Sequence, residues 1–312
     1  MRDHLLVSGG AGFLGSAFIR YTLQHRPCTI VNLDNLTYAA NEPHIDHPNY
    51  TFIKGDICDR PLLDQILEQH PIDTLVHFAA ESHVDRSISD AAPFINSNIV
   101  GTYHLLEAVR QYPDIHFHHI STDEVYGSTT PEAPFHPHSP YRPNSPYAAS
   151  KAASDHLVRA FAKTYNLKTT LSHSCNNYGP YQHQEKFIPT IISHARQKKP
   201  IPIYGQGLNK RTWIHVDDHA EALWHILDKG QSGETYPIGT SDLISNLDLV
   251  HTLLPLIDPN APITFVADRP GHDLAYVLDT TKTTTELNWQ PKIPLTVGLE
   301  HTVNWYLNAV PV

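Results

Sequence analysis

The chain has 312 residues, and its 22 Lys and Arg against 32 Asp and Glu give a formal net charge of −10 at pH 7. This acidic balance argues against a surface that binds nucleic acid or an anionic membrane, and no stretch approaches the ~20 apolar residues of a membrane span. Three isolated cysteines without Cys-x-x-Cys spacing are typical of a reducing compartment. We therefore expect a cytoplasmic protein of one or two lobes with neither a nucleic-acid nor a membrane partner.

Strand and helix patterns alternate through the first half of the chain. Short apolar runs predict strands at residues 5–8, 29–33, 50–54, 74–78, 116–121 and 169–172. Helical patterns lie between these strands. One follows a glycine-rich turn after the first strand, and the others are at residues 60–69, 95–109 and 146–165. This order predicts an α/β fold of Rossmann type, with a doubly wound parallel sheet.

Glycines at positions 9, 12 and 15 lie between the first predicted strand and the first predicted helix. Such glycines permit a tight turn and a close approach of the backbone to a pyrophosphate at the helix N-terminus. Asp34 ends the second predicted strand, ~20 residues after the glycine motif. A carboxylate at this position binds the ribose hydroxyls of the cofactor and would repel a 2′-phosphate. The motif therefore favours NAD over NADP. The predicted cofactor contacts are Gly9, Gly12, Phe13, Leu14, Gly15, Asp34, Asn35, Leu36, Thr37, Asp56, Ile57, Phe78, Ala79 and Ala80.

A second pair of motifs carries reactive side chains. Thr122, Asp123 and Glu124 follow the fifth predicted strand, and Tyr147 and Lys151 lie four residues apart in a predicted helix. That spacing puts the phenol and the ammonium on one helix face, where we expect the Lys charge to lower the pKa of the phenol so that it can act as a base. The adjacent carboxyls supply one group to protonate a leaving group and another to take a proton from carbon. The pattern predicts an enzyme that oxidises a sugar hydroxyl, eliminates water and reduces again.

Together with the runs at residues 79–87, 176–181 and 268–273, these motifs resemble those of the dTDP-glucose 4,6-dehydratases, a family of extended short-chain dehydrogenases/reductases. The resemblance covers nearly the whole chain. It implies a lyase that converts dTDP-glucose into dTDP-4-keto-6-deoxyglucose and water, with NAD as cofactor, in deoxysugar biosynthesis of the rhamnose type.

The resemblance also implies a role for each reactive residue. Tyr147 would take the proton from O4 while NAD takes the hydride from C4 and later returns it to C6. Lys151 would hold the ribose and the phenolate, and Thr122 would hydrogen-bond O4. Glu124 would remove the C5 proton, and Asp123 would protonate the departing C6 hydroxyl.

Further ligands follow from the same resemblance. Ser82 would contact both cofactor and substrate, Ser97 and Asn177 the cofactor, and Asn176 the substrate phosphates. The other substrate-binding residues implied are Lys186, Phe187, Pro202, Ile203, Tyr204, Arg211, Asn246, Asp268, Arg269, Pro270, Gly271 and His272. Thr212 stands where the family usually has Asp, and Ser174-Cys175 inverts the usual order. These departures leave the choice between a thymidine and a uridine nucleotide open.

The domain division follows the same reasoning. Residues 1–178 are expected to form the NAD-binding Rossmann domain, with a return segment at about 215–240, and residues 179–312 mainly a sugar-nucleotide-binding lobe. Because proline and turn residues become frequent after residue 178, we expect this smaller lobe to consist of short helices and loops. The apolar faces of residues 95–109 and 146–165 correspond to the family's dimer interface, so the resemblance implies a homodimer.

Two other functions stay open. One is another NAD-dependent sugar-nucleotide enzyme, such as a 4-epimerase or a UDP-sugar 4,6-dehydratase, and the other is a non-catalytic NAD-binding sensor that kept the fold. The 23 histidines include His116, His118 and His119, and also His136 and His138. Because no second shell or complete ligand set accompanies them, we interpret them as packed or solvated side chains and predict no metal site.

Overall fold

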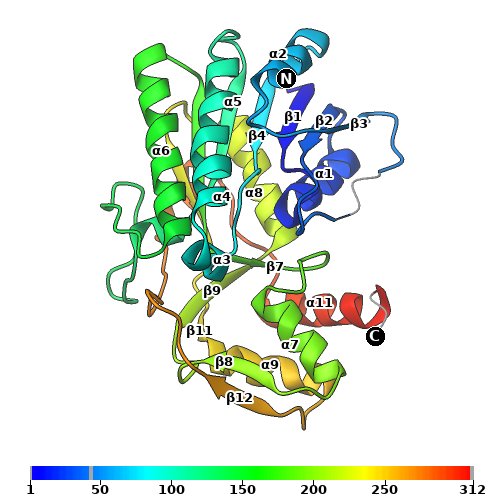
Figure 1. The fold of residues 1–312 in the computed structure, drawn as a ribbon, viewed down its shortest axis with the longest axis vertical. Helices are drawn as coiled ribbons and strands as arrows, with labels where there is room; N and C mark the ends of the chain where they lie inside the picture. The colour runs from blue at the N-terminus through cyan, green and yellow to red at the C-terminus, as the bar shows by residue number, and fades with distance from the viewer. Residues whose placement is uncertain (1, 42–44, 310–312) are drawn as a thin grey trace.

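A computed structural model describes residues 2–41 and 45–309 and has a seven-stranded sheet at its centre (Figure 1). The strand order is β10-β6-β5-β4-β1-β2-β3, and every neighbouring pair is parallel. The strands are β1 (His4–Ser8), β2 (Thr29–Asp34), β3 (Tyr50–Lys54), β4 (Thr74–His77), β5 (His116–Thr122), β6 (Thr169–Ser174) and β10 (Thr235–Ile238). The predicted α/β fold with a doubly wound parallel sheet is confirmed.

Helices cover both faces of this sheet, which is why its central strands are buried on both sides. On one face, α1 (Phe13–His25) packs against α8 (Val216–Lys229), and Phe18 stacks on Trp224 with ring centroids 5.9 Å apart. On the other face lie α2 (Arg60–Gln69), α5 (Thr102–Val109) and α6 (Pro146–Tyr165). The chain leaves β1 toward β2 on one side and reaches β4 on the other. This reversal opens a crevice at the carboxyl ends of the strands.

The predicted helices at 60–69 and 146–165 have the observed bounds of α2 and α6. The Ser145 hydroxyl caps α6 by accepting from the Ala148 backbone N–H at 3.1 Å, and Pro146 occupies the first turn. The helix predicted at 95–109 is present, but its first half, Ile95–Gly101, is π-helical and α5 begins at Thr102. The Thr102 hydroxyl donates to the Asn98 carbonyl at 2.6 Å and so competes with the regular backbone pattern.

The second half differs more from its prediction. Instead of only short helices and loops, it contains a three-stranded sheet, β11-β9-β7, and a two-stranded sheet, β12-β8. These strands are β7 (Asn176–Tyr178), β8 (Ile201–Tyr204), β9 (Lys210–His215), β11 (Leu243–Ser245) and β12 (Ile263–Val266). The helices are α7 (Phe187–Arg196), α9 (Asn246–Ile257), α10 (Thr281–Leu287) and α11 (Leu295–Ala309), with α3 (Val84–Ser89) and α4 (Ala92–Phe94) in the first half. A two-stranded sheet has only edge strands, so it tolerates Pro202, whose presence obscured β8 in the sequence.

Three of the histidines considered as metal ligands, His116, His118 and His119, lie in β5. His116 and His118 each lie within hydrogen-bond distance of the Thr170 hydroxyl, at 2.8 and 2.7 Å. His119 contacts Ser154 and Asp155, at 3.1 and 3.3 Å. His136 and His138 are exposed. Within residues 2–41 and 45–309, no group of three His, Cys, Asp or Glu side chains is arranged to hold a metal ion, and no helix is long and apolar enough to cross a membrane.

Candidate active site

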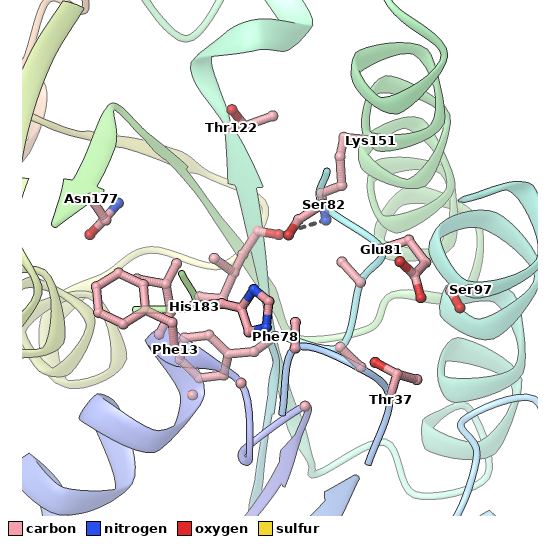
Figure 2. A pocket seen from close by; sticks show the side chains of 18 of the residues that line it. Phe13, Thr37, Phe78, Glu81, Ser82, Ser97, Thr122, Lys151, Asn177 and His183 are labelled. Atoms are coloured by element: carbon pink, nitrogen blue, oxygen red, sulfur yellow. Dashed lines mark hydrogen bonds between the residues drawn. The ribbon is translucent and has the colours of Figure 1, made fainter. Parts of the chain in front are cut away.

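A cleft of about 340 Å³ lies at the carboxyl ends of the central strands. In Figure 2, Phe13 and Phe78 lie toward one end of it and Thr122 and Lys151 toward the other. Its walls come from the β1–α1 turn, the ends of β2, β4 and β5, the start of α6, and β7. The predicted residues that line it are Gly9, Gly12, Phe13, Leu14, Gly15, Asp34, Asn35, Thr37, Asp56, Ile57, Phe78, Ala79, Ala80, Ser82, Ser97, Thr122, Asp123, Glu124, Tyr147, Lys151, Asn176, Asn177 and Lys186.

The three glycines of the β1–α1 turn have different neighbours. Gly9 has a φ of +76°, and a Cβ there would lie 2.4 Å from the Ala79 nitrogen. A Cβ on Gly15 would lie 2.3 Å from the Gly9 carbonyl oxygen, whereas one on Gly12 would meet only that oxygen, at 3.3 Å. Gly9 and Gly15 are thus required by the packing of the turn itself. Gly12 leaves the start of α1 open to the cleft, where a phosphate could approach the helix N-terminus.

Asp34 is held rigidly at the end of β2. Its Oδ2 accepts from the Ala11 backbone N–H at 2.9 Å, and its Oδ1 accepts from the Leu36 N–H at 2.8 Å. Burial raises the pKa of this carboxyl, and the two backbone hydrogen bonds lower it again in part. Leu36 has a left-handed backbone with a φ of 55° and does not line the cleft, so its contact with Asp34 is the role that the structure gives it.

Asp123 and Glu124 form the first turn of a 3₁₀ helix that follows β5 directly. Thr122 joins them, because its hydroxyl donates to Asp123 Oδ1 and accepts from the Glu124 N–H, both at 3.3 Å. Burial, followed by the neighbouring charge of Glu124, raises the pKa of Asp123 to about 8. Burial also raises the pKa of Glu124 overall, but the charges of Arg269, Arg211 and Lys186 limit that rise. The surroundings therefore favour Asp123 as a proton donor and Glu124 as a proton acceptor.

Tyr147 and Lys151 extend from the first two turns of α6. The sequence predicted a lowered pKa for the Tyr147 phenol, and this is wrong, because its pKa is raised. Burial and the charge of Glu124 raise the pKa of Tyr147, and a hydrogen bond with Thr122 lowers it in part. The Lys151 ammonium has other partners. Its Nζ donates to the Ile120 carbonyl at 2.8 Å and lies 3.3 Å from His119 Nε2. Burial lowers the pKa of Lys151 itself to about 8.

Three predicted nucleotide-binding residues, Lys186, Arg269 and His272, each have a polar partner within the chain. Lys186, which lines the cleft, donates from Nζ to the Ser82 carbonyl at 2.9 Å. The Arg269 guanidinium lies 3.5 Å from the Asp85 carboxylate, and His272 Nδ1 lies 2.6 Å from Asp268 Oδ1. The charges of Arg269 and Lys186 both lower the pKa of Glu124, so this cationic group is close enough to act on the reactive carboxyls.

Three predicted substrate residues are placed differently from the expectation. Ile203 is 1% exposed and belongs to a hydrophobic core against which Phe187 also packs, so its side chain cannot line a base. Alternation along β8 instead leaves Pro202 half-buried and Tyr204 exposed. Arg211 is also buried, and its guanidinium donates to the carbonyls of Lys210 and Asp273, at 2.7 and 3.0 Å.

The chain is similar to known proteins over nearly its whole length. A family model described as GDP-mannose 4,6 dehydratase matches residues 6–302. The curated dTDP-glucose 4,6-dehydratase of Haemophilus influenzae is 48% identical over 97% of this chain and 98% of that protein. The chain belongs to the dTDP-glucose 4,6-dehydratase family.

Solved structures agree with this assignment. A dTDP-glucose 4,6-dehydratase from Streptomyces venezuelae, solved with NAD bound, superposes with a TM-score of 0.94 at 43% identity, over 98% of this chain and 97% of that one. A UDP-glucose 4-epimerase from Thermus thermophilus, in complex with NAD, reaches 0.93 at only 27% identity, over 98% and 100% of the two chains. The fold is thus common to dehydratases and epimerases, and the sequence identity separates them.

Several residues that line the cleft were not predicted from the sequence as site residues. They are Leu33, Ala39, Ala40, Gly55, Glu81, Ile120, Ser121, Ser174, Cys175, Gln182 and His183. Glu81 had a usable signal, because it lies in the run 79–87 between two predicted ligands. Its backbone N–H and C=O both bond the side chain of Asn98, at 2.8 and 3.0 Å, which fixes this wall of the cleft against the π-helical segment. Gln182 and His183 come from a loop that no local pattern connects with the cofactor turn.

Proposed function

We propose that the protein converts dTDP-glucose into dTDP-4-keto-6-deoxyglucose and water, as its dTDP-glucose 4,6-dehydratase relatives are named for doing. The observation that carries the proposal is the pair of carboxyls at the end of β5. Asp123, with a pKa raised to about 8, can be a proton donor at neutral pH, while three cations limit the rise that burial causes in the pKa of Glu124. An elimination of water needs both an acid and a base, and an epimerisation at C4 needs neither carboxyl.

The cleft fits an NAD cofactor. The open N-terminus of α1 beside Gly12 suits the pyrophosphate, and the Asp34 carboxylate suits the adenosine ribose. NAD bound in the related Streptomyces venezuelae enzyme supports this choice. When bound, NAD would take the hydride from C4 of the sugar and return it to C6.

The chain's own residues would carry the remaining steps. Tyr147 takes the proton from O4, assisted by its hydrogen bond with Thr122, and the ketone formed at C4 acidifies the C5 proton. Glu124 removes that proton, and Asp123 donates its own to the C6 hydroxyl as water leaves. Lys151, which also lines the cleft, would hold the cofactor ribose and the phenolate.

The substrate would extend from the reactive carboxyls toward residues 179–312, which we propose as the sugar-nucleotide lobe beside a Rossmann domain of residues 1–178. Lys186, Arg269 and His272 are the groups best placed for the diphosphate, because Lys186 lines the cleft and the side chain of Arg269 is only partly buried. Tyr204, exposed on β8, offers a ring for the base. Thymidine is the base that the named relatives support.

We also propose a cytoplasmic homodimer. The free thiols of Cys28, Cys58 and Cys175 support a reducing compartment. The helices α5 and α6 lie side by side (Figure 1). The dimer is supported by exposed apolar side chains on them, with Tyr103 of α5 and Tyr165 of α6 both in edge contact with Phe161. Ile95, 52% exposed, extends this surface at the start of the π-helical segment.

The test is to incubate the purified protein separately with dTDP-glucose and with UDP-glucose and to follow the mass of the product. Loss of one water from dTDP-glucose, abolished by Asp123→Ala together with Glu124→Ala, is the expected result. Loss from UDP-glucose alone would keep the chemistry and change the nucleotide. Unchanged mass with an altered sugar configuration would identify an epimerase, and no reaction in NAD-bound protein would favour the sensor.

A further inference from the structure

A buried polar cluster lies behind Lys151, on the side that does not face the cleft. Lys151 contacts the Ile120 carbonyl and His119 Nε2, and these two contacts leave one of the three ammonium N–H donors for the cleft. The direction of that last donor therefore depends on His119. His119 is fully buried, so whatever fixes its ring also fixes the ammonium.

Asp155 and Ser154 both contact this ring, and the Ser154 hydroxyl lies 3.1 Å from His119 Nε2. Asp155 is the one of the two that carries a charge. It lies on α6 four residues after Lys151, on the same helix face, and is fully buried. Its Oδ1 lies 3.3 Å from His119 Nε2. A proton on Nε2 can be shared with Asp155 or Ser154, and a bare Nε2 accepts from Lys151. In both arrangements the imidazole lies between Lys151 and Asp155. His119 Nδ1 has no hydrogen-bond partner among the described residues, so Nε2 carries all of the ring's polar contacts.

The second carboxylate oxygen of Asp155 is also held. Oδ2 accepts from the Tyr141 hydroxyl at 2.8 Å and lies 2.9 Å from His173 Nε2, and His173 Nδ1 lies 2.7 Å from the Tyr126 hydroxyl. Against the effect of burial, these partners of Oδ2, together with the contact of His119 on Oδ1, hold the pKa of Asp155 well below its usual range, and Oδ1 has no other partner among the described residues.

The protonation of Lys151 depends on the charged groups around Lys151 and Asp155. Burial lowers the pKa of His119 to about 4, so the bridging ring is neutral at pH 7 and does not cancel the carboxylate. Among the described residues, Asp155 is the acidic group whose charge raises the pKa of Lys151 against the effect of burial. The titratable or charged groups that face Lys151 and Asp155 from the surrounding elements are His77 of β4, His119 of β5, His173 of β6, Tyr126, Tyr141, and Tyr147 and Arg159 of α6.

We propose that Asp155 is a positioning residue whose carboxylate, acting through His119, keeps the Lys151 side chain protonated and aimed into the cleft. A buried ammonium without a counter-charge loses its proton several pH units earlier than an exposed one. A neutral Lys151 could no longer hold a phenolate by charge. The catalytic consequence rests on the proposed function, whereas the link between the two side chains does not.

The link is measured directly by nuclear magnetic resonance on the NAD-bound protein carrying lysine labelled with carbon-13 at Cε. The Lys151 signal is assigned by its absence from Lys151→Met, and its titration midpoint is compared with that of Asp155→Asn. We expect Asp155→Asn to move the midpoint to lower pH by about one unit or more. Tyr141→Phe, which removes one hydrogen bond and keeps the carboxylate, is the matched control and should leave the midpoint in place.

His119→Ala is a second variant in case Asp155→Asn does not fold, because it removes the bridging ring and keeps the carboxylate. A midpoint displaced to lower pH in this variant supports transmission through the ring. An unmoved midpoint in the folded variants would overturn the proposal.

The catalytic consequence is measured in a background of Asp123→Asn with Glu124→Gln, which cannot eliminate water and so should retain the hydride on the cofactor. Near-ultraviolet absorbance then follows reduced cofactor after addition of dTDP-glucose. Adding Asp155→Asn should slow its formation about tenfold at neutral pH and move the alkaline limb of the pH profile to lower pH. An unmoved limb would overturn the positioning role. If the background protein forms no reduced cofactor while the Lys151 midpoint still moves, the proposed function fails and the link stands.

Discussion

The Arg269 guanidinium lies 3.5 Å from the Asp85 carboxylate, and the Tyr204 hydroxyl donates to the other oxygen of Asp85 at 2.9 Å. Two predicted nucleotide ligands are thus connected by a residue of α3 that the sequence prediction did not include. Both side chains of the ion pair are partly exposed, so the pair itself contributes little to stability. The ion pair matters because it holds the Arg269 guanidinium close enough for its charge to act on Glu124.

Arg269→Ala should therefore raise the KM for the sugar nucleotide by about tenfold to a hundredfold, because a phosphate loses a charged fork. The kcat should change less, since Arg269 is not at the reacting carbons. Asp85→Asn is the control, because it removes the ion pair and keeps the guanidinium, and it should change KM by less than about threefold. Equal effects of the two variants in steady-state kinetics would mean that Arg269 acts through Asp85 and not as a phosphate ligand.

The pH dependence of activity should report Asp123. Since the pKa of this buried carboxyl is about 8, its acid form is lost as the pH rises through that value, and the rate of dehydration should fall there. Asp123→Asn should lower kcat by about a hundredfold or more across the whole range and let reduced cofactor accumulate. A pH profile that keeps its alkaline limb in a variant still active enough to measure would assign that limb to another group.

The same carboxyl makes a prediction about stability. Its pKa is raised from 3.8 to about 8 by folding, so between these values the folded state binds a proton that the unfolded chain releases. The contribution of this group to stability should accordingly be present at low pH and be lost as the pH rises through this window. Asp123→Asn should melt at a higher temperature than the wild type at pH 8, with a smaller difference at pH 4. A difference that is independent of pH would contradict this assignment.

Gly12 and Gly15 offer a matched pair in the cofactor turn. Gly12→Ala should fold normally, because its Cβ meets only the Gly9 carbonyl, at 3.3 Å, but the methyl group should reduce the NAD retained through purification. Gly15→Ala should lower the free energy of unfolding by about 2 kcal/mol, since its Cβ would lie 2.3 Å from the same oxygen. Thermal melting and quantification of released cofactor separate the two effects. Equal loss of stability in both variants would show that Gly12 is also a packing residue.

The proposed dimer predicts a mass by light scattering of twice the 35.1 kDa of one chain. Ile95→Glu combined with Tyr103→Glu should reduce it to that of a monomer, because charges would replace apolar contacts. Phe265→Glu is the control, since this residue is 57% exposed on β12, in another part of the molecule. A wild-type monomer at micromolar concentration would remove the dimer proposal.

The sequence predicted the elements of the main sheet well because each depends on local spacing. The bounds of α2 and α6 follow from capping residues and periodicity, and the glycine turn and Asp34 follow from a fixed register between strand, turn and helix. The small sheets were missed because their strands have three to six residues each, and prolines such as Pro202 resemble loop signals. The inward direction of Ile203 depends on which side of β8 the core lies, which a four-residue strand does not reveal.

By itself, the sequence determined which reactive groups are present and in what order: Thr122, Asp123 and Glu124 after a strand, and Tyr147 and Lys151 on one helix face. Only the tertiary structure decided what each group can do. Burial raises the pKa of Asp123 and so favours its acid form, whereas cations from other segments limit the rise that burial causes in the pKa of Glu124. Lys151 contacts the Ile120 carbonyl and His119, which the helix spacing alone does not reveal. Burial and long-range charge come from residues far apart in the chain, so no local pattern contains them.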